Sequence, residues 1–147
     1  MNTPQKMFTK VYGIQLENIS VVELHIQTNR EPDFNETPNE EEIKVSFGHS
    51  EYDSENKVFL VAAKLEIGVK EDSKSPYSLK VEIVGNFCVD ENEFSVSQID
   101  DWAERNAPFI LYPYIREHTY ALMIRSGFKP IILPLLETPV LQQKKES

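Results

Sequence analysis

The stretch NAPFILYPYIRE, residues 106–117, opens the most strongly patterned part of this sequence. Pro108 suits the first turn of a helix, where a missing backbone N–H costs no intrahelical bond. Beyond it, side chains suited to one helix face recur at helical spacing, at Leu111, Ile115, His118 and Leu122. Gly127 is placed to end the helix as its C-terminal cap. The sequence therefore predicts one long helix, irregular near Pro113.

A shorter helix is predicted just before the long one. The segment SVSQ, residues 95–98, has the pattern of a capping box. Three carboxylates follow where the helix dipole favours negative charge, at Asp100, Asp101 and Glu104. Arg105 and Asn106 then close this helix, so that two helices follow each other with almost no linker.

Upstream of residue 90 the apolar period changes from helical to alternating, which indicates strands. Alternation predicts four of them, at residues 8–26 (with a bend near 17–18), 43–47, 57–70 and 77–89. The last three are joined by connections short enough for hairpins, which favours an antiparallel meander. Between the first two strands lies a polar connection, residues 28–42, rich in Pro, Asn and carboxylates. Strands followed by helices indicate an α+β fold.

One domain accounts for the whole chain. Its 147 residues, of which 40% are hydrophobic, suffice for a single core, and we found neither internal repeats nor a linker. The predicted architecture is a four-stranded antiparallel sheet packed on C-terminal helices, spanning residues 1–147. Residues 1–7 and 138–147 are predicted to be flexible tails. After Pro134 the sequence leaves no room for another long helix.

Charge and cysteine content narrow the class of protein. A net charge of −9 argues against nucleic-acid binding and against an anionic membrane surface. It is compatible with a basic protein partner, or with a surface kept soluble by like-charge repulsion. Cys88 is the single cysteine, so no internal disulfide forms, and no apolar run approaches the length of a membrane span. We therefore expect a cytoplasmic protein.

No catalytic or metal-binding constellation is visible. The three histidines, His25, His49 and His118, lie far apart and follow no metal-ligand spacing. The chain has only five scattered glycines, which leaves no Gly-rich phosphate loop. Asp100 and Asp101 are neighbours in a helix and point in different directions, so they are better explained as charge at a helix start. The sequence predicts a protein that is not an enzyme and needs no cofactor.

Aromatic residues are concentrated in the long helix and just beyond it. Five lie within twenty residues, at Phe109, Tyr112, Tyr114, Tyr120 and Phe128. A helix that packs one face on the sheet and another on a partner subunit would explain them. An apolar surface that accepts unfolded polypeptide would explain them equally well. Composition leaves both interpretations open.

The segment at residues 106–117 is similar to the one that opens the long helix in the SecB family of protein-export chaperones. In that family an apolar stretch, an aromatic, Pro-Tyr and Arg-Glu follow in order, matched here across residues 106–117. A turn with Arg and Gly and an aromatic near Pro comes next, matched by residues 125–130. The short apolar run before Pro134 completes the pattern. The resemblance touches most of residues 11–136 and is dense in the last thirty.

This resemblance implies an ATP-independent holdase that assembles as a dimer of dimers through its long helices. It holds unfolded precursors and hands them to the translocase motor SecA. The client-binding positions it implies are aromatic and apolar, at Phe34, Phe109, Tyr112, Tyr114, Phe128, Ile131 and Leu133. The oligomer interface would use the helix face of Leu111, Ile115, His118 and Leu122. No direct membrane insertion and no nucleic acid are implied.

The sequence departs from the family in two places. Where the family carries acidic and apolar residues that receive the basic tail of SecA, this chain has Asn18, Val22, Ser78 and Lys80. The usual docking to SecA is therefore not expected, unless Glu17, Glu23 or Glu82 replaces the missing charge. The helix that usually follows the last apolar run is not expected here either, because residues 137–147 are few and contain Pro139.

Two functional hypotheses follow from this combination. The first is a general holdase of the export type, binding unfolded precursors. The second is a dedicated chaperone of one client, such as the antitoxin of a toxin–antitoxin pair, which the altered SecA face favours. A small enzyme or ligand-binding domain on the same fold is a third interpretation, which the missing constellation disfavours.

Overall fold

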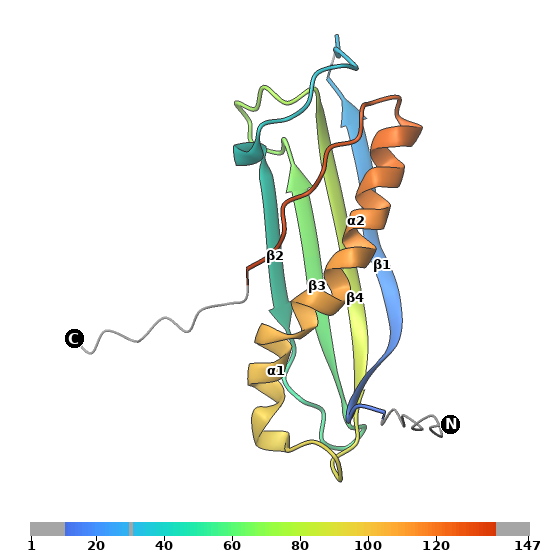
Figure 1. Ribbon diagram of the computed structural model, residues 1–147, viewed down its shortest axis with the longest axis vertical. Helices are drawn as coiled ribbons and strands as arrows, with labels where there is room; N and C mark the ends of the chain where they lie inside the picture. The colour runs from blue at the N-terminus through green and yellow to red at the C-terminus, as the bar shows by residue number, and fades with distance from the viewer. Residues whose placement is uncertain (1–10, 30, 138–147) are drawn as a thin grey trace, which may run out of the picture.

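The computed structural model describes residues 11–29 and 31–137 (Figure 1). The predicted tails, residues 1–7 and 138–147, lie outside the described residues. The strands are β1 (Ile14–Thr28), β2 (Ile43–His49), β3 (Val58–Ile67) and β4 (Tyr77–Val89). Two α-helices, α1 (Ile99–Arg105) and α2 (Ala107–Arg125), follow them, and short 3-10 turns η1 (Glu40–Glu42) and η2 (Val96–Gln98) precede β2 and α1.

The four strands form one antiparallel sheet in the order β1-β4-β3-β2. The predicted α+β fold class and the β2-β3-β4 meander are confirmed. The polar connection after β1 crosses over, so that β1 pairs with β4 and leaves β2 as the opposite edge (Figure 1). Two irregularities interrupt β1, between Leu16 and Asn18 and between Val21 and Glu23, the first at the predicted bend.

Strict alternation explains why β3 and β4 form the centre of the sheet. Along β4 every second side chain is buried, from Tyr77 to Val89, and β3 follows the same pattern. These buried side chains make the inner face of the sheet, whereas Lys80, Glu82 and their neighbours lie on the outer face. Antiparallel register places Phe59 opposite Phe87, and their rings stack at a centroid distance of 5.3 Å.

Both helices cover the inner face (Figure 1). Helix α2 buries Leu111, Ile115 and Met123 completely against the sheet. From α1, Trp102 packs edge-on to Phe87, with ring centroids 5.5 Å apart. Among the described residues, no helix is long and apolar enough to cross a membrane.

Several strand boundaries and one helix cap differ from the sequence-based prediction; for example, β2 ends at His49 and not at residue 47. Residues 11–13 are not strand, so the first strand begins at Ile14 and not at residue 8, and residues 8–10 lie outside the described part. The third strand ends at Ile67 because Gly68 turns the chain with φ +65°. The capping box is absent, because the Ser95 hydroxyl is 2.9 Å from the Ser97 hydroxyl and caps no backbone N–H.

After Gly127, which has φ +87° as expected for a helix C-terminal cap, residues 129–137 cross the inner face as an extended segment. Leu133 is buried in the core, and the Tyr112 hydroxyl donates a hydrogen bond to the Pro134 carbonyl oxygen. This segment, coloured red in Figure 1, runs beside α2 and reaches the β2 side of the sheet. This segment therefore borders the surface above β2 on one side.

Replacing Gly68 by Ala should destabilise the fold, because a β-carbon there would clash with the Tyr77 carbonyl oxygen and φ is positive. We expect Gly68→Ala to lower the free energy of unfolding by about 1–3 kcal/mol in a urea titration. Gly48→Ala is the matched control, because a β-carbon there has no neighbour within 4 Å. Equal effects of the two substitutions would contradict this turn geometry.

Candidate functional site

The structure divides the predicted client-binding residues by exposure. Tyr112, Phe128 and Leu133 are buried in the core, and Ile131 is half-buried against it. These four residues pack beneath the surface that a client would contact. Three aromatics remain open to solvent, with exposed fractions of 47% for Phe34, 39% for Phe109 and 42% for Tyr114. These three do not form one cluster, because each lies beside a different part of the surface.

Phe109 lies at a hollow between the β2 edge and the start of α2. The hollow has a volume of about 230 Å³ and is lined by Val45, Ser46, Phe47, Glu104, Pro108, Phe109, Leu136 and Glu137. A second hollow, of about 240 Å³, shares Phe47 and Glu104 with it and continues past Gly48, His49, Val61 and Ala103. We call the two together the edge groove. Most of its lining is apolar, and its carboxylates are Glu104 and Glu137.

Each wall of the edge groove has a local cause. Alternation along β2 turns Val45, Phe47 and His49 toward the inner face. Helix α1 has only seven residues and does not extend over the whole edge strand. The extended segment after α2 adds Leu136 and Glu137 from the other side. The result is an apolar surface that the short helix leaves partly uncovered.

Phe34 lies at the far end of α2 and belongs to the polar crossover connection. Its ring packs on Phe128 at a centroid distance of 4.9 Å, and Phe128 in turn packs on Tyr77 at 4.6 Å. The Phe34 carbonyl oxygen accepts a hydrogen bond from the Lys129 N–H at 3.4 Å. The crossover is thus attached to the start of the extended segment, while nearly half of the Phe34 ring stays open.

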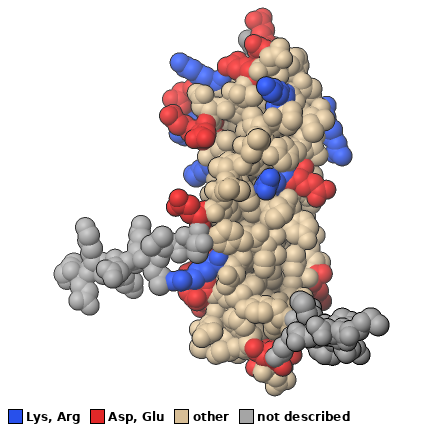
Figure 2. Space-filling view, in the orientation of Figure 1, with Lys and Arg blue, Asp and Glu red and all other residues tan. Residues whose placement is uncertain are grey.

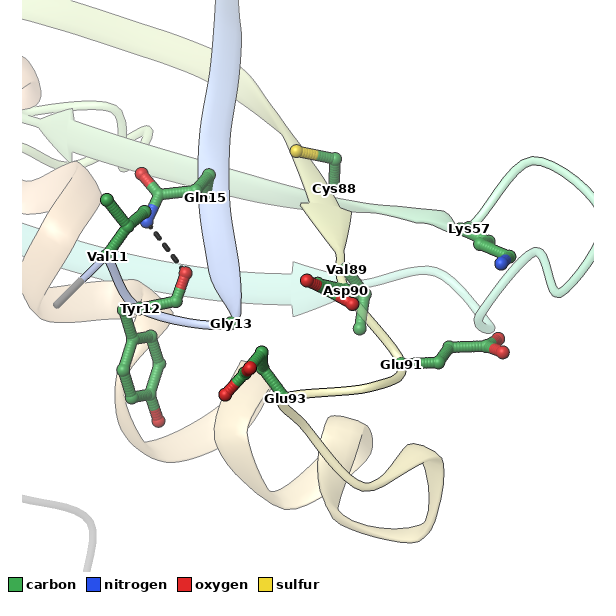
Figure 3. Close-up of a pocket in the computed structure, with 10 residues that line it drawn as sticks. All are labelled: Val11, Tyr12, Gly13, Gln15, Lys57, Cys88, Val89, Asp90, Glu91 and Glu93. Carbon is green, nitrogen blue, oxygen red and sulfur yellow. Dashed lines mark hydrogen bonds between the residues drawn. The ribbon is translucent and has the colours of Figure 1, made fainter.

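A larger hollow, not predicted from the sequence, lies where β1 begins and β4 ends (Figure 3). Its volume is about 620 Å³, and Tyr12, Lys57 and Cys88 line it together with the carboxylates of Asp90, Glu91 and Glu93. The Tyr52 hydroxyl donates to Glu91 at 2.7 Å. Burial and this hydrogen bond raise the pKa of Tyr52 to about 12. Within residues 11–29 and 31–137, no three His, Cys, Asp or Glu side chains come together as a metal site.

His49 joins the edge strand to α1 at the floor of the edge groove. Its Nδ1 is 2.9 Å from the Ser50 carbonyl oxygen and its Nε2 is 3.3 Å from Glu104 Oε1. Only the imidazolium can donate from both nitrogens. Burial acts to lower the pKa of His49, but hydrogen bonds to Ser50 and Glu104 and the charge of Asp100 outweigh it and raise the pKa above 6.5.

The protonated form of His49 is therefore favoured by folding. Its stabilising contribution is complete below pH 6.5 and is lost as the pH rises through the pKa of His49 in the folded state. We expect Glu104→Gln to lower that pKa, measured by an NMR titration of the ring. Glu137→Gln, which alters the other carboxylate of the edge groove, should leave it in place. An unchanged pKa in Glu104→Gln would show that the contact is absent in solution.

The predicted partner-face positions lie on or beside the outer face of the sheet. Ser78 and Lys80 alternate with buried residues of β4, Asn18 pairs with Asn86, and Val22 lies at an irregularity of β1 with 58% of its side chain exposed. The register sets lysines beside glutamates there, through the pairs Lys44–Glu66, Lys80–Glu66 and Lys64–Glu82. Glu23 faces another glutamate, Glu82, which itself lies opposite Lys64 on its other side. Three lysines and three glutamates share these pairs, so the paired part of this face is charge-balanced.

The helix residues predicted to contact a partner subunit do not share one environment. Leu111 and Ile115 are fully buried against the chain's own sheet, whereas His118 and Leu122 are half-buried. The side of α2 that faces away from the sheet has other members at heptad-like spacing, namely Ile110, Tyr114, Glu117, Ala121 and Ile124. We call this set the outer stripe of α2. Its three large apolar members are exposed by 37–61%.

Charged side chains are unevenly distributed over the helix-covered face of the molecule. In Figure 2 they gather at the upper end of the molecule and along its edges, whereas the lower half, over α1 and the start of α2, is mostly uncharged.

Four residues that line the edge groove were not predicted from the sequence: Val45, Phe47, Pro108 and Leu136. Alternation along the second strand indicates that Val45 and Phe47 face inward. It does not indicate that α1 is too short to cover them, and this is why the groove was not predicted.

Comparisons with known proteins agree with this architecture. The family model described as preprotein translocase subunit SecB matches residues 8–146. An uncharacterised protein of Methanocaldococcus jannaschii is 34% identical over 82 residues, which are 55% of this chain and 52% of that protein. This chain thus spans about half the length of that curated relative.

A solved structure shows the same fold. A Mycobacterium tuberculosis SecB-like chaperone, determined in complex with a ChAD peptide from the HigA1 antitoxin, has a TM-score of 0.57 at 20% identity, covering 86% of this chain and 93% of that one. A protein of unknown function from Streptococcus agalactiae gives a TM-score of 0.44 at 16% identity, covering 86% of this chain and 100% of that one. On the family match across residues 8–146, the chain belongs to the SecB family.

Proposed function

We propose that this SecB-family chain is an ATP-independent holdase that binds unfolded polypeptide segments in its edge groove. The observation that carries the proposal is the groove itself, an apolar surface beside an edge strand with Phe109 39% exposed. Large apolar surfaces left open on a folded domain commonly mark interaction sites. Phe34 provides a further exposed ring for a segment that continues along the molecule, whereas Tyr114 belongs to the outer stripe of α2.

Holding requires no chemical step. Many weak apolar contacts compete with aggregation as long as the client remains unfolded, and release follows from dissociation. The chain therefore acts by binding and not by catalysis, with no cofactor. We propose that it does so in the cytoplasm, where the unpaired thiol of Cys88 would stay reduced.

The client range distinguishes two versions of this function. A general holdase of the export type would bind many precursors and pass them to SecA. The charge-balanced outer face favours the second version, a chaperone dedicated to one client, because it offers no net negative surface to a basic SecA tail. The structural neighbour bound to an antitoxin peptide makes an antitoxin-like segment the kind of client to test first.

A panel aggregation assay without nucleotide separates the two versions. Several unrelated, chemically unfolded proteins and one antitoxin-type protein are diluted into buffer with and without this chain, and light scattering is followed. Suppression across the panel supports the general holdase, and suppression of the antitoxin-type protein alone supports the dedicated chaperone. If scattering is unchanged for every protein, the proposed holding function is wrong.

We further propose that subunits associate, as a dimer of dimers, through the outer stripe of α2 and the adjacent inner side of β1. On β1, Val21 and Leu24 face the same side as the buried core but remain exposed by 49% and 43%. Together with Ile110, Tyr114 and Ile124 they form an uncovered apolar face. A second copy of the chain would bury this face.

Ile124→Asp is expected to separate the subunits, because it places a carboxylate in the most exposed apolar position of the outer stripe, 61% open. Sedimentation should show the wild type as an oligomer and the variant at a smaller mass. Ile132→Asp, at a position that is 88% exposed and outside the stripe, is the matched control and should sediment like the wild type. A wild type that sediments as a single subunit would refute the interface.

A further inference from the structure

The outer edge of strand β2 offers backbone groups for hydrogen bonding, in addition to the side chains that line the groove. Strand order places β2 at one edge of the sheet, and no described residue pairs with its outer edge. Two backbone hydrogen bonds flank the ladder between β2 and β3, from the Gly68 N–H to the Glu42 carbonyl oxygen at 3.1 Å and from the Ser50 N–H to the Leu60 carbonyl oxygen at 2.9 Å. These two bonds determine which backbone groups of β2 face outward.

In an antiparallel ladder, hydrogen-bonded pairs alternate with pairs that are not bonded to each other. Residues 42 and 50 bond to β3, and the register between them is unbroken, so Lys44, Ser46 and Gly48 bond to β3 as well. Val45 and Phe47 therefore direct their N–H and C=O groups to the free edge. The Ile43 N–H, by contrast, already donates to the Glu40 carbonyl oxygen.

The same two residues line the edge groove with their side chains. An extended polypeptide that pairs with β2 would exchange backbone hydrogen bonds with Val45 and Phe47. Side chains directly opposite in a ladder lie on the same face of the sheet. The client's residues opposite Val45 and Phe47 would therefore point into the groove, toward Phe109 and Leu136, and the residues between them would point to the outer face.

We propose that the edge groove binds its client as an added β-strand on β2, an inference that rests on the proposed holding function. The occupant is an extended polypeptide segment with apolar side chains at two alternate positions. Those positions should not be acidic, because the carboxylates of the first hollow, Glu104 and Glu137, have no Lys or Arg beside them in the lining. In this mode the backbone hydrogen bonds supply affinity, and the two side chains that enter the groove supply selectivity.

Hydrogen exchange measured by NMR tests the mode at single residues. A reduced, carboxymethylated protein, which cannot refold, is added at saturating concentration. Strand addition protects the amides of Val45 and Phe47, which are open in the free chain, and changes those of Lys44 and Ser46 little, because these already bond to β3. If the protein binds and the Val45 and Phe47 amides exchange as before, strand addition is wrong and holding stands. If it does not bind, the holding function fails first.

A proline substitution provides a second test. Val45→Pro removes an N–H that points to the free edge and that β3 does not use, so the ladder should survive. Val45→Ala is the matched control, since it trims the side chain and keeps the N–H. We expect Val45→Pro to bind the same unfolded protein about three- to tenfold more weakly than Val45→Ala, the range for losing one backbone hydrogen bond. Equal affinity of two variants with the same unfolding curve would overturn the proposal.

Discussion

Leu111→Ala is expected to lower the free energy of unfolding by about 2–5 kcal/mol, the usual range for emptying a fully buried leucine site. The Leu111 side chain is completely buried between α2 and the sheet. It packs over Gly85, where a β-carbon would come within 2.9 Å of Leu111 Cδ2. Because the glycine lets the helix approach this closely, the truncated side chain leaves a cavity that the neighbours fill only in part. Denaturant titration measures the loss.

The comparison with Leu122→Ala shows which surface each residue serves. Leu122 is only half-buried, so its truncation should cost clearly less in the same titration. The difference between Leu111→Ala and the wild type should also stay the same when the protein concentration is varied, because the lost contacts lie within one subunit. A difference that grew on dilution would instead place Leu111 at a subunit interface.

Phe109→Asp is expected to weaken the binding of an unfolded polypeptide by at least about tenfold, because it removes an aromatic contact and desolvates a new charge. The ring lines the edge groove, where Glu104 and Glu137 already supply negative charge. Position 109 lies in the first turn of α2, where an aspartate is compatible with the helix dipole, so the fold should be retained. Fluorescence anisotropy of a labelled, reduced and carboxymethylated protein gives the affinity.

Two controls make this result specific to the groove. Phe109→Tyr keeps the ring and should bind within a factor of about two of the wild type, since the exposed edge can accommodate a hydroxyl. Ile132→Asp introduces the same charge at an exposed position outside the groove and should bind like the wild type. Equal weakening in Phe109→Asp and Ile132→Asp would mean that net charge, and not the groove, controls binding.

Regular patterns predicted the fold where burial follows a simple period. Strand β4 occupies the predicted residues, because its alternation is unbroken from Tyr77 to Val89. The ends of other strands depended on single backbone features, such as the positive φ of Gly68, that alternation does not encode. The capping box failed for a similar reason. A serine at position 95 can satisfy its hydroxyl with Ser97, and the sequence pattern does not distinguish the two partners.

The site was harder to predict than the fold. Helical spacing correctly grouped Leu111 with Ile115, but it does not tell whether that face meets the chain's own sheet or another subunit. The outer stripe, beginning at Ile110, has an equally regular spacing. The edge groove depends on three segments distant in sequence and on the short length of α1. Such features arise only when the elements are assembled, although the SecB-like segment at residues 106–117 indicated the right family.

The most direct test of the central claim is the affinity of this chain for a permanently unfolded protein in the absence of nucleotide. Anisotropy of a labelled, reduced and carboxymethylated protein should rise to saturation as the chain is added. Addition of ATP should not change the curve, and the same labelled protein in its native, disulfide-intact form should not bind. No saturable binding, or equal binding of the native and unfolded forms, would contradict a holdase that recognises exposed polypeptide.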